Sequence, residues 1–359
     1  MANRYFSKGT RALYKYQSVK YFHFGVAPGS PLALTSDPWS YLYSWLSQKL
    51  KKSRGTNKEC IQRAIYYSEL ASDFYKASNA TELPTKGTLA YYGMLNLVKC
   101  FISVKGVELE KTWEHHGITL QKGKSQKIEI RRPSSGISIF NEFASILDTP
   151  VTTIHQDSLK GICQNIPELH EIAYNLGLLT SPIRRKFLPV NIEFLVNEEK
   201  NKIFTEMSYE KSHEARVDTT KFYKGARKAY FYEPYEEKGK VIYRSKKRKN
   251  LTQQNCPTVY KNIVKEYRPF SLVSLLTQSG YRYYCDLRPG DFHHLAYSLA
   301  LMFYIGSVTR YRPSETAKLL HGPIRPIIGE AVAICPMQFL YQLVGLTTES
   351  VCVVPHSKI

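Results

Sequence analysis

An arginine and two histidines stand close together in residues 286–313, which read DLRPGDFHHLAYSLALMFYIGSVTRYRP. Arg288 lies five residues before His293 and six before His294. To cleave RNA through its own 2′-hydroxyl, an enzyme needs a group that moves a proton and a cation that stabilises the charge on the phosphate. Arg288, His293 and His294 are therefore candidate catalytic residues of a ribonuclease.

The same residues also have a purely structural interpretation. Pro289 and Gly290 predict a turn, and Asp291 is expected to cap the helix that follows. The positive end of the helix dipole would then lower the pKa of a histidine in the first turn and favour the neutral base. The alternative is that the turn only starts a buried helix and that one histidine packs in the core or bonds to a neighbour.

Other polar clusters in the chain offer less chemistry. His115 and His116 are adjacent and could bind a metal, but no acidic or thiol residue has the spacing of a further ligand. Arg310 and Arg312 follow the apolar run and could pair with Glu315. The sequence contains no phosphate-binding glycine loop, dinucleotide fingerprint or nucleophile elbow. We therefore expect no metal site and no cofactor.

The composition favours a soluble protein with a polyanionic partner. The 359 residues include 50 Lys and Arg against 30 Asp and Glu, a net charge of +20, and each phosphate neutralised by such a residue releases a counterion. The seven cysteines form no CxxC pair, which indicates buried thiols in a reducing cytoplasm. No signal peptide is apparent, and the longest apolar stretch, about 295–308, is too short to span a bilayer. We expect a cytoplasmic location and no membrane span.

The basic residues are densest at 216–249, with 12 basic against 4 acidic residues. Aromatic residues alternate with them, a combination that suits single-stranded nucleic acid: cations follow the phosphates while rings stack on unpaired bases. The predicted nucleic-acid-binding residues are Lys224, Arg227, Lys228, Tyr230, Tyr232, Arg244, Lys246, Lys247, Arg248 and Lys249. The alternative is that one aromatic face is core and that the lysines only form a solvated loop or protect a sheet edge.

The helices and strands that position these residues can be predicted from the sequence pattern. The pattern indicates an α+β protein that is mostly α. Residues 1–115 and 271–359 have helical patterns, and Asp37 and Pro38 mark the start of one helix. Residues 61–74 predict a helix that buries Ile61, Ile65, Leu70 and Phe74. Residues 116–270 read as a mixed α/β insertion with short antiparallel strands, including a hairpin that turns at 236–239. We expect the two helical regions to pack together as one bundle.

Several passages resemble the YaaC-like family of bacterial proteins. They are AIYYSELASDFYKASNATELPTKGTLAYYGMLNLVKCFISVKG at 64–106, HHGITL at 115–120, NIPELHEIAY at 165–174 and HHLAYSLALMFYIGSVTRYRPSETAKLLHG at 293–322. The paired helices of the first passage also resemble HEPN-type helical bundles, which occur in bacterial toxins and antiviral effectors. Ribonucleases of that type use an Arg-x(4–6)-His motif, which Arg288 and either His293 or His294 would satisfy.

Three functions are consistent with these observations. The first is a nucleic-acid-associated protein that binds RNA or single-stranded DNA, a non-catalytic subunit of a bacterial defence or RNA-processing assembly. The second, implied by the HEPN resemblance, is a metal-independent endoribonuclease that uses Arg288 with His293 or His294. The third is an interaction module without nucleic acid, whose charge meets an acidic partner or an anionic membrane surface. A protein partner or a homodimer is compatible with each of them.

Overall fold

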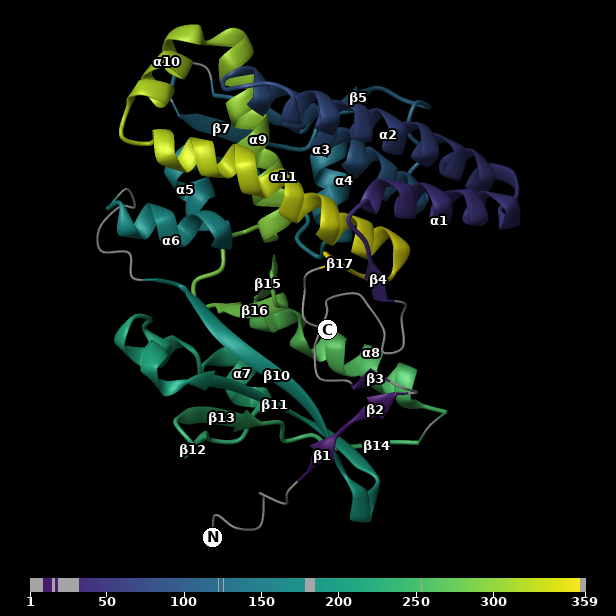
Figure 1. Ribbon diagram of the computed structural model, residues 1–359, viewed down its shortest axis with the longest axis vertical. Helices are drawn as coiled ribbons and strands as arrows, with labels where there is room; N and C mark the ends of the chain where they lie inside the picture. The colour runs from purple at the N-terminus through teal and green to yellow at the C-terminus, as the bar shows by residue number, and fades with distance from the viewer. Residues whose placement is uncertain are drawn as a thin grey trace. The chain divides into compact units, whose positions relative to one another are not determined.

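The structure is a computed structural model, and it describes residues 9–14, 17–18, 32–121, 123–124, 126–177, 185–252 and 254–355. The chain forms two compact units, each built from separate stretches of sequence (Figure 1). Unit 1 consists of residues 1–34, 184–289 and 349–359, and unit 2 of residues 35–183 and 290–348. Residues 116–183, which follow the predicted N-terminal helical region, thus belong to the same unit as the helices.

Unit 2 contains most of the described α-helices. They are α1 (Pro38–Lys52), α2 (Gly55–Asn79), α3 (Thr85–Val104), α4 (Ile139–Ile146), α5 (Leu159–Gln164), α6 (Pro167–Asn175), α9 (His294–Tyr311), α10 (Pro313–His321) and α11 (Arg325–Thr348). The start of α1 is the one predicted, because a side-chain oxygen of Asp37 accepts hydrogen bonds from the backbone N–H groups of Trp39 and Ser40.

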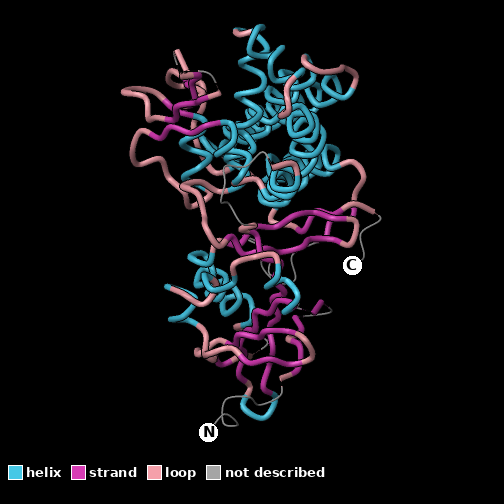
Figure 2. Tube along the Cα trace, turned by 90° about the vertical axis from the view of Figure 1, so that its left-hand side faces the viewer, coloured by secondary structure: helices cyan, strands magenta, loops and turns pink. Residues whose placement is uncertain are grey.

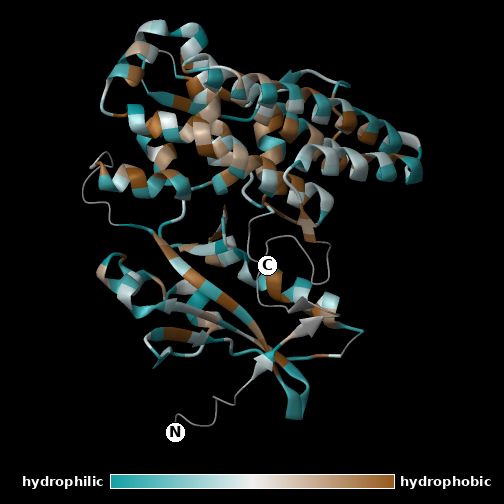
Figure 3. Cartoon of the chain, viewed as in Figure 1, coloured by the Kyte–Doolittle hydropathy of each residue, from teal (hydrophilic) through white to brown (hydrophobic). Residues whose placement is uncertain are grey.

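The core of unit 2 lies where helices from both ends of the chain meet. Helix α3 packs against α2, and also against α9 and α11 from the C-terminal region. The predicted bundle of N- and C-terminal helices is therefore confirmed, and Figure 3 shows hydrophobic residues along these helices. Among the described helices, α11 alone is long and apolar enough to cross a membrane, but 72% of its most apolar window is buried, as in the core helix of a globular protein.

Short strands cover one part of this helical unit. They are β5 (Glu114–His115), β6 (Ile118–Leu120), β7 (Lys127–Ile130), β8 (Ile137–Ser138) and β9 (His155–Ser158). Strand β7 lies between β6 and β9 in an antiparallel sheet, and β5 pairs in parallel with β8. The loops between these strands form the pocket described below.

Unit 1 is built around an antiparallel sheet in the order β12-β13-β11-β10-β16-β15, while β1 also pairs with β10 and β14 with β11. These strands are β1 (Thr10–Arg11), β10 (Phe187–Asn197), β11 (Lys202–Glu210), β12 (Tyr235–Glu237), β13 (Lys240–Arg244), β14 (Lys249–Asn250), β15 (Leu272–Thr277) and β16 (Gly280–Asp286). Unit 1 contains more strand than helix, whereas unit 2 is mostly helix (Figure 2).

Unit 1 also contains two further strand pairs and two α-helices, besides short 3-10 helices. Strand β2 (Leu13–Tyr14) pairs with β3 (Gln17–Ser18), and β4 (Leu32–Leu34) pairs in parallel with β17 (Val351–Val353). The helices are α7 (Gly225–Tyr230) and α8 (Cys256–Tyr267). Strands β12 and β13 form the predicted hairpin, with the turn at Lys238 and Gly239.

Candidate functional site

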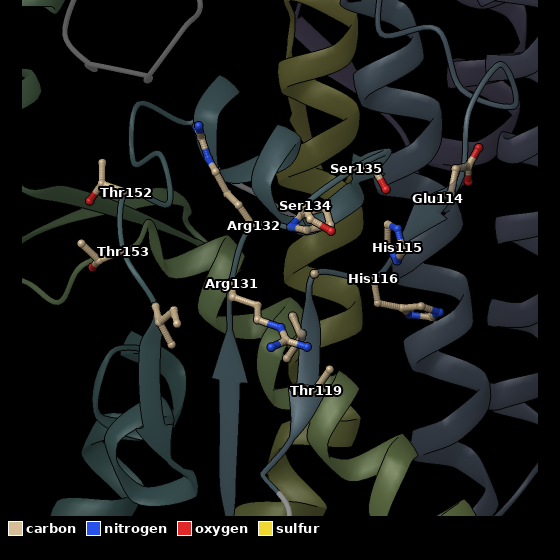
Figure 4. Close-up of a pocket in the computed structure, with 14 residues that line it drawn as sticks. Glu114, His115, His116, Thr119, Arg131, Arg132, Ser134, Ser135, Thr152 and Thr153 are labelled. Atoms are coloured by element: carbon tan, nitrogen blue, oxygen red, sulfur yellow. The ribbon is translucent and has the colours of Figure 1, made fainter.

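A pocket of about 890 Å³ opens among the short strands of unit 2. Its volume falls in the range of small-molecule sites. The lining residues are Glu114, His115, His116, Gly117, Ile118, Thr119, Arg131, Arg132, Pro133, Ser134, Ser135, Thr152, Thr153 and Ile154, which together define the His116 pocket. Figure 4 shows the loop that carries Arg131, Arg132 and Ser134 between Thr152 and Thr153 on one side and the two histidines on the other.

Many hydrogen-bond donors of the His116 pocket have no partner among the residues that the structure describes. Within the described part of the chain, six lining side chains make no hydrogen bond or ion pair: His115, Arg132, Ser134, Ser135, Thr152 and Thr153. Protein polar groups that converge without an internal partner are available to a ligand. Hydroxyl, guanidinium and imidazole groups together suit an anion with several acceptor oxygens.

The charge of the pocket also favours an anionic ligand. Arg131 and Arg132 are both exposed, and the ion pair of Arg131 with Glu129 is long at 3.9 Å. The only carboxylate that lines the pocket belongs to Glu114, and Lys99 neutralises it at 2.7 Å. The net charge that faces a ligand is therefore positive, which favours phosphate or carboxylate over a cation.

His116 is the pocket residue with the most structured surroundings. Protein around the ring lowers its pKa, and the positive charges of Lys99 and Arg310 lower the pKa further, which favours the neutral imidazole. Its Nδ1 is hydrogen-bonded to the hydroxyl of Tyr91. Burial raises the pKa of Tyr91, so this hydroxyl stays protonated and can donate to Nδ1. The proton of the neutral imidazole then lies on Nε2, which can donate to a ligand.

The residues around His116 come from separate passages that carry the family resemblance. Tyr91 and Tyr92 lie on α3, and Arg310 lies near the end of α9. Arg310 donates to the hydroxyl of Tyr92 and lies over its ring, 5.1 Å from the centroid. The ring of Phe303 on α9 contacts both Tyr91 and His116. These helices thus hold the HHG segment at the edge of the pocket.

Arg312 follows this group and makes the predicted pair with Glu315 at 3.2 Å. Its guanidinium also donates to the backbone oxygens of Gln121 and Lys124. Glu315 accepts further bonds from Tyr304 and from the backbone of Gln126. This cluster therefore ties the loop between β6 and β7 to α10.

Arg288 and the two candidate histidines belong to different units. In unit 1, the backbone N–H of Arg288 donates to Asp286, and its backbone oxygen accepts a bond from Lys186. In unit 2, His293 precedes the first residue of α9, and its Nδ1 accepts the backbone N–H of Leu295. The catalytic assignment of these residues stays a prediction.

The prediction that Asp291 caps this helix is wrong. The capping group is the imidazole of His293, because the helix begins three residues later than Asp291. The carboxylate of Asp291 instead pairs with Nδ1 of His155 at 2.9 Å. A histidine can replace the usual carboxylate or hydroxyl here because its neutral ring offers one acceptor nitrogen.

His294 is buried inside unit 2, where its Nε2 hydrogen-bonds to Gln342 at 3.1 Å. Burial lowers the pKa of His294 to about 4. The unfolded chain therefore binds this proton at a higher pH than the folded chain, and the free energy of unfolding must fall as pH falls from about 6.5 to about 4. Burial also lowers the pKa of His293, which acts in the same direction.

We expect a His294→Gln variant to lose part of this pH dependence. Glutamine can still bond to Gln342 but takes up no proton, so up to about 1.4 kcal/mol per pH unit should disappear from the slope. The measurement is urea unfolding at several pH values between about 4 and 7. His321→Gln, at an exposed position, is the control and should keep the wild-type slope. Equal slopes in all three proteins would contradict the assignment.

In the predicted basic surface of unit 1, the two most central arginines have internal partners. Arg244 on β13 is only 6% exposed and forms an ion pair with Glu206 on β11. The guanidinium of Arg227 on α7 donates to the backbone oxygens of Phe222 and Phe270 at 2.6 and 2.9 Å. Each guanidinium group thus holds neighbouring segments of unit 1 together. It is therefore less available to a phosphate.

The aromatic residues predicted to stack on bases also have contacts inside the unit. The ring of Tyr230 makes edge contacts with Phe231, Tyr267 and Phe270. Tyr230 is the last residue of helix α7, so it is not part of a strand. Both tyrosines are only partly exposed. These two tyrosines therefore expose little ring surface on which a base could stack.

The lysines of the segment are more accessible. Lys246 is exposed and donates to the backbone oxygen of Lys228, which brings α7 and the loop after β13 together. Lys224, Lys228 and Lys247 are exposed, and their ammonium groups have no partner in the described part of the chain. The two remaining predicted residues are partly buried: Lys249 pairs with Glu266 at 2.8 Å, and Arg248 lies over the ring of Phe204.

The arginines and hydroxyls of the His116 pocket were not predicted from the sequence, although His115 and His116 were noted. A local signal exists in the run RRPSSG at 131–136, where two cations and two hydroxyls flank a proline and precede a glycine with φ of +80°. Such a turn exposes its side chains. That Thr152 and Thr153 complete the pocket depends on pairing between β7 and β9, which the sequence does not reveal.

Comparison with known protein families identifies a match. A family model described as YaaC-like Protein matches residues 32–346, which includes every residue of the His116 pocket. The match does not support the likeness to HEPN-type bundles. No curated protein and no solved structure shows a significant match to the chain.

Proposed function

The chain belongs to the YaaC-like protein family. We propose that it is a nucleic-acid-associated member of this family, which binds phosphate groups of the nucleic acid in the His116 pocket and does not cleave the nucleic acid. The observation that carries the proposal is the set of six lining side chains that have no polar partner in the described part of the chain. Hydrogen bonds from arginine to phosphate are among the strongest in proteins, and flanking hydroxyls can complete the contacts to the remaining oxygens.

The overall charge supports nucleic acid as the source of the phosphate. With a net charge of +20, the protein attracts a long polyanion more strongly than a single small anion. The exposed ammonium groups of Lys224, Lys228 and Lys247 offer further phosphate contacts in unit 1. The role as a subunit of a defence or RNA-processing assembly is part of the same proposal and predicts co-purification with nucleic acid and with another protein.

A binding titration tests the proposal directly. Purified protein is mixed with labelled single-stranded RNA, single-stranded DNA and a mononucleotide over a salt series from about 50 to 300 mM. We expect binding that weakens with salt, with a slope in log K against log salt of about −0.7 for each phosphate bound. Stronger binding of the oligonucleotides than of the mononucleotide supports nucleic acid, and the reverse order indicates a free nucleotide as ligand.

The same samples test the ribonuclease alternative. Cleavage of the RNA that disappears in a His293→Ala/His294→Ala variant would establish catalysis and contradict the non-catalytic proposal. An intact oligonucleotide together with salt-dependent binding agrees with it. If no oligonucleotide binds even at the lowest salt, both readings fail and the interaction module becomes the better hypothesis.

A further inference from the structure

Trp113 is an exposed aromatic residue that directly precedes the His116 pocket in the chain. The residue is 82% exposed, although tryptophan usually buries most of its surface. Its backbone is nevertheless fixed, because its carbonyl oxygen accepts the N–H of Ile137 at 2.8 Å. Gly136 packs so closely that an added Cβ would lie 2.3 Å from the same oxygen. The indole is therefore held out in solvent by an ordered backbone.

The position of Trp113 relative to the pocket follows from its neighbours in the chain. Trp113 directly precedes β5, and both residues of that strand, Glu114 and His115, line the pocket. The backbone partner of Trp113 follows Ser135 and Gly136, so the indole is carried beside the hydroxyl-bearing loop. Ile154 lines the pocket from the 152–154 segment and is 65% exposed. Apolar surface is thus exposed next to the cations.

We propose that the His116 pocket selects phosphates that carry an unpaired nucleobase, with the base stacked on the indole of Trp113 and the phosphate bound by Arg131 and Arg132. This inference depends on the proposed function and adds the class of ligand to it. An indole beside a cationic pocket resembles the stacking platforms of single-strand-binding proteins, whose aromatic residues accept any base. A duplex keeps its bases stacked on one another, so the pocket would discriminate against double strands.

Two substitutions separate stacking from phosphate binding. Trp113→Leu keeps apolar bulk but removes the flat aromatic surface, so we expect it to weaken binding of a single-stranded oligonucleotide by roughly tenfold or more. Its binding of an abasic oligonucleotide of the same length should be unchanged. Trp113→Phe keeps an aromatic ring and should restore part of the affinity. Wild-type protein should bind the abasic oligonucleotide more weakly than the one with bases.

Fluorescence provides an independent readout, because the chain has three tryptophans and the other two have contacts with neighbours: Trp39 packs on Tyr75 and Trp45 lies under Lys49. In a Trp39→Phe/Trp45→Phe background, the base-containing oligonucleotide should quench the emission of Trp113 and the abasic one should not. If wild-type protein binds the oligonucleotide but Trp113→Leu binds equally well, stacking is refuted and phosphate binding stands. If wild-type protein binds neither oligonucleotide, both proposals fail.

Discussion

An Asp286→Ala variant should lose about 3–5 kcal/mol of unfolding free energy, because it leaves the ammonium group of Lys186 buried and uncompensated. The two side chains are only 5% and 7% exposed, and their charged atoms lie 2.7 Å apart. Burial raises the pKa of Asp286 and lowers the pKa of Lys186, and the charge of each partner opposes this shift. Asp286 also accepts the backbone N–H of Arg288, so the chain beyond β16 would loosen as well.

Urea unfolding measures this loss, and two controls make the result specific. Glu236→Ala removes an exposed partner of Lys211 and should change the free energy of unfolding by no more than about 1 kcal/mol. The double variant Lys186→Met/Asp286→Leu removes both charges and should be more stable than either single variant, since no unpaired charge stays buried. Equal stability losses for Asp286→Ala and Glu236→Ala would show that the buried pair is not the reason.

Replacing both arginines of the His116 pocket should have the largest effect on binding. In an Arg131→Gln/Arg132→Gln variant, the phosphate loses two charge-assisted contacts, each worth about 1.5–3 kcal/mol, so affinity should fall at least about 100-fold. Stability should change little, because Arg132 has no polar partner in the described residues and the ion pair of Arg131 is long and exposed.

Loss of general charge is excluded by a matched control. Lys51→Gln/Lys52→Gln removes the same charge from exposed positions of α1, outside the pocket lining. We expect this control to weaken binding only slightly and mainly at low salt, because distant charges are screened. If both double variants lose affinity equally, the pocket does not bind the phosphate and the attraction is diffuse.

Much of the fold could be predicted from local patterns. The cap at Asp37, the helix pair α2 and α3, and the β12–β13 hairpin were each indicated by capping, periodicity or turn residues. The buried face of α2 was predicted less well. Ile61 is buried as expected, but Ile65 and Phe74 are only partly buried, while Ala64 and Tyr75 lie in the core. Small residues allow α3 to approach closely, and a pattern based on large apolar residues misses this.

The candidate site was harder to predict because its parts come together through long-range pairing. The density of basic residues predicts a nucleic-acid-binding surface at residues 216–249. Two of its arginines, Arg227 and Arg244, instead bond to groups inside unit 1. A count of charges cannot tell a solvated cation from one that closes an ion pair between strands. In unit 2, a shorter basic run gains a pocket only because β7 and β9 bring Thr152 and Thr153 beside it.

The division of the chain into alternating stretches has a consequence for the order in which it can fold during synthesis. Helix α3 leaves the ribosome long before α9 and α11, which bury it, because the stretch 184–289 of unit 1 is made in between. Strand β4 likewise cannot pair until its partner β17, at residues 351–353, has been synthesised. The surface of α3 that packs against α9 and α11 is thus uncovered until those helices are made, and exposed apolar surface of this kind promotes aggregation of a nascent chain. Neither unit corresponds to a single continuous gene fragment, so studies of isolated units require a permuted or spliced chain.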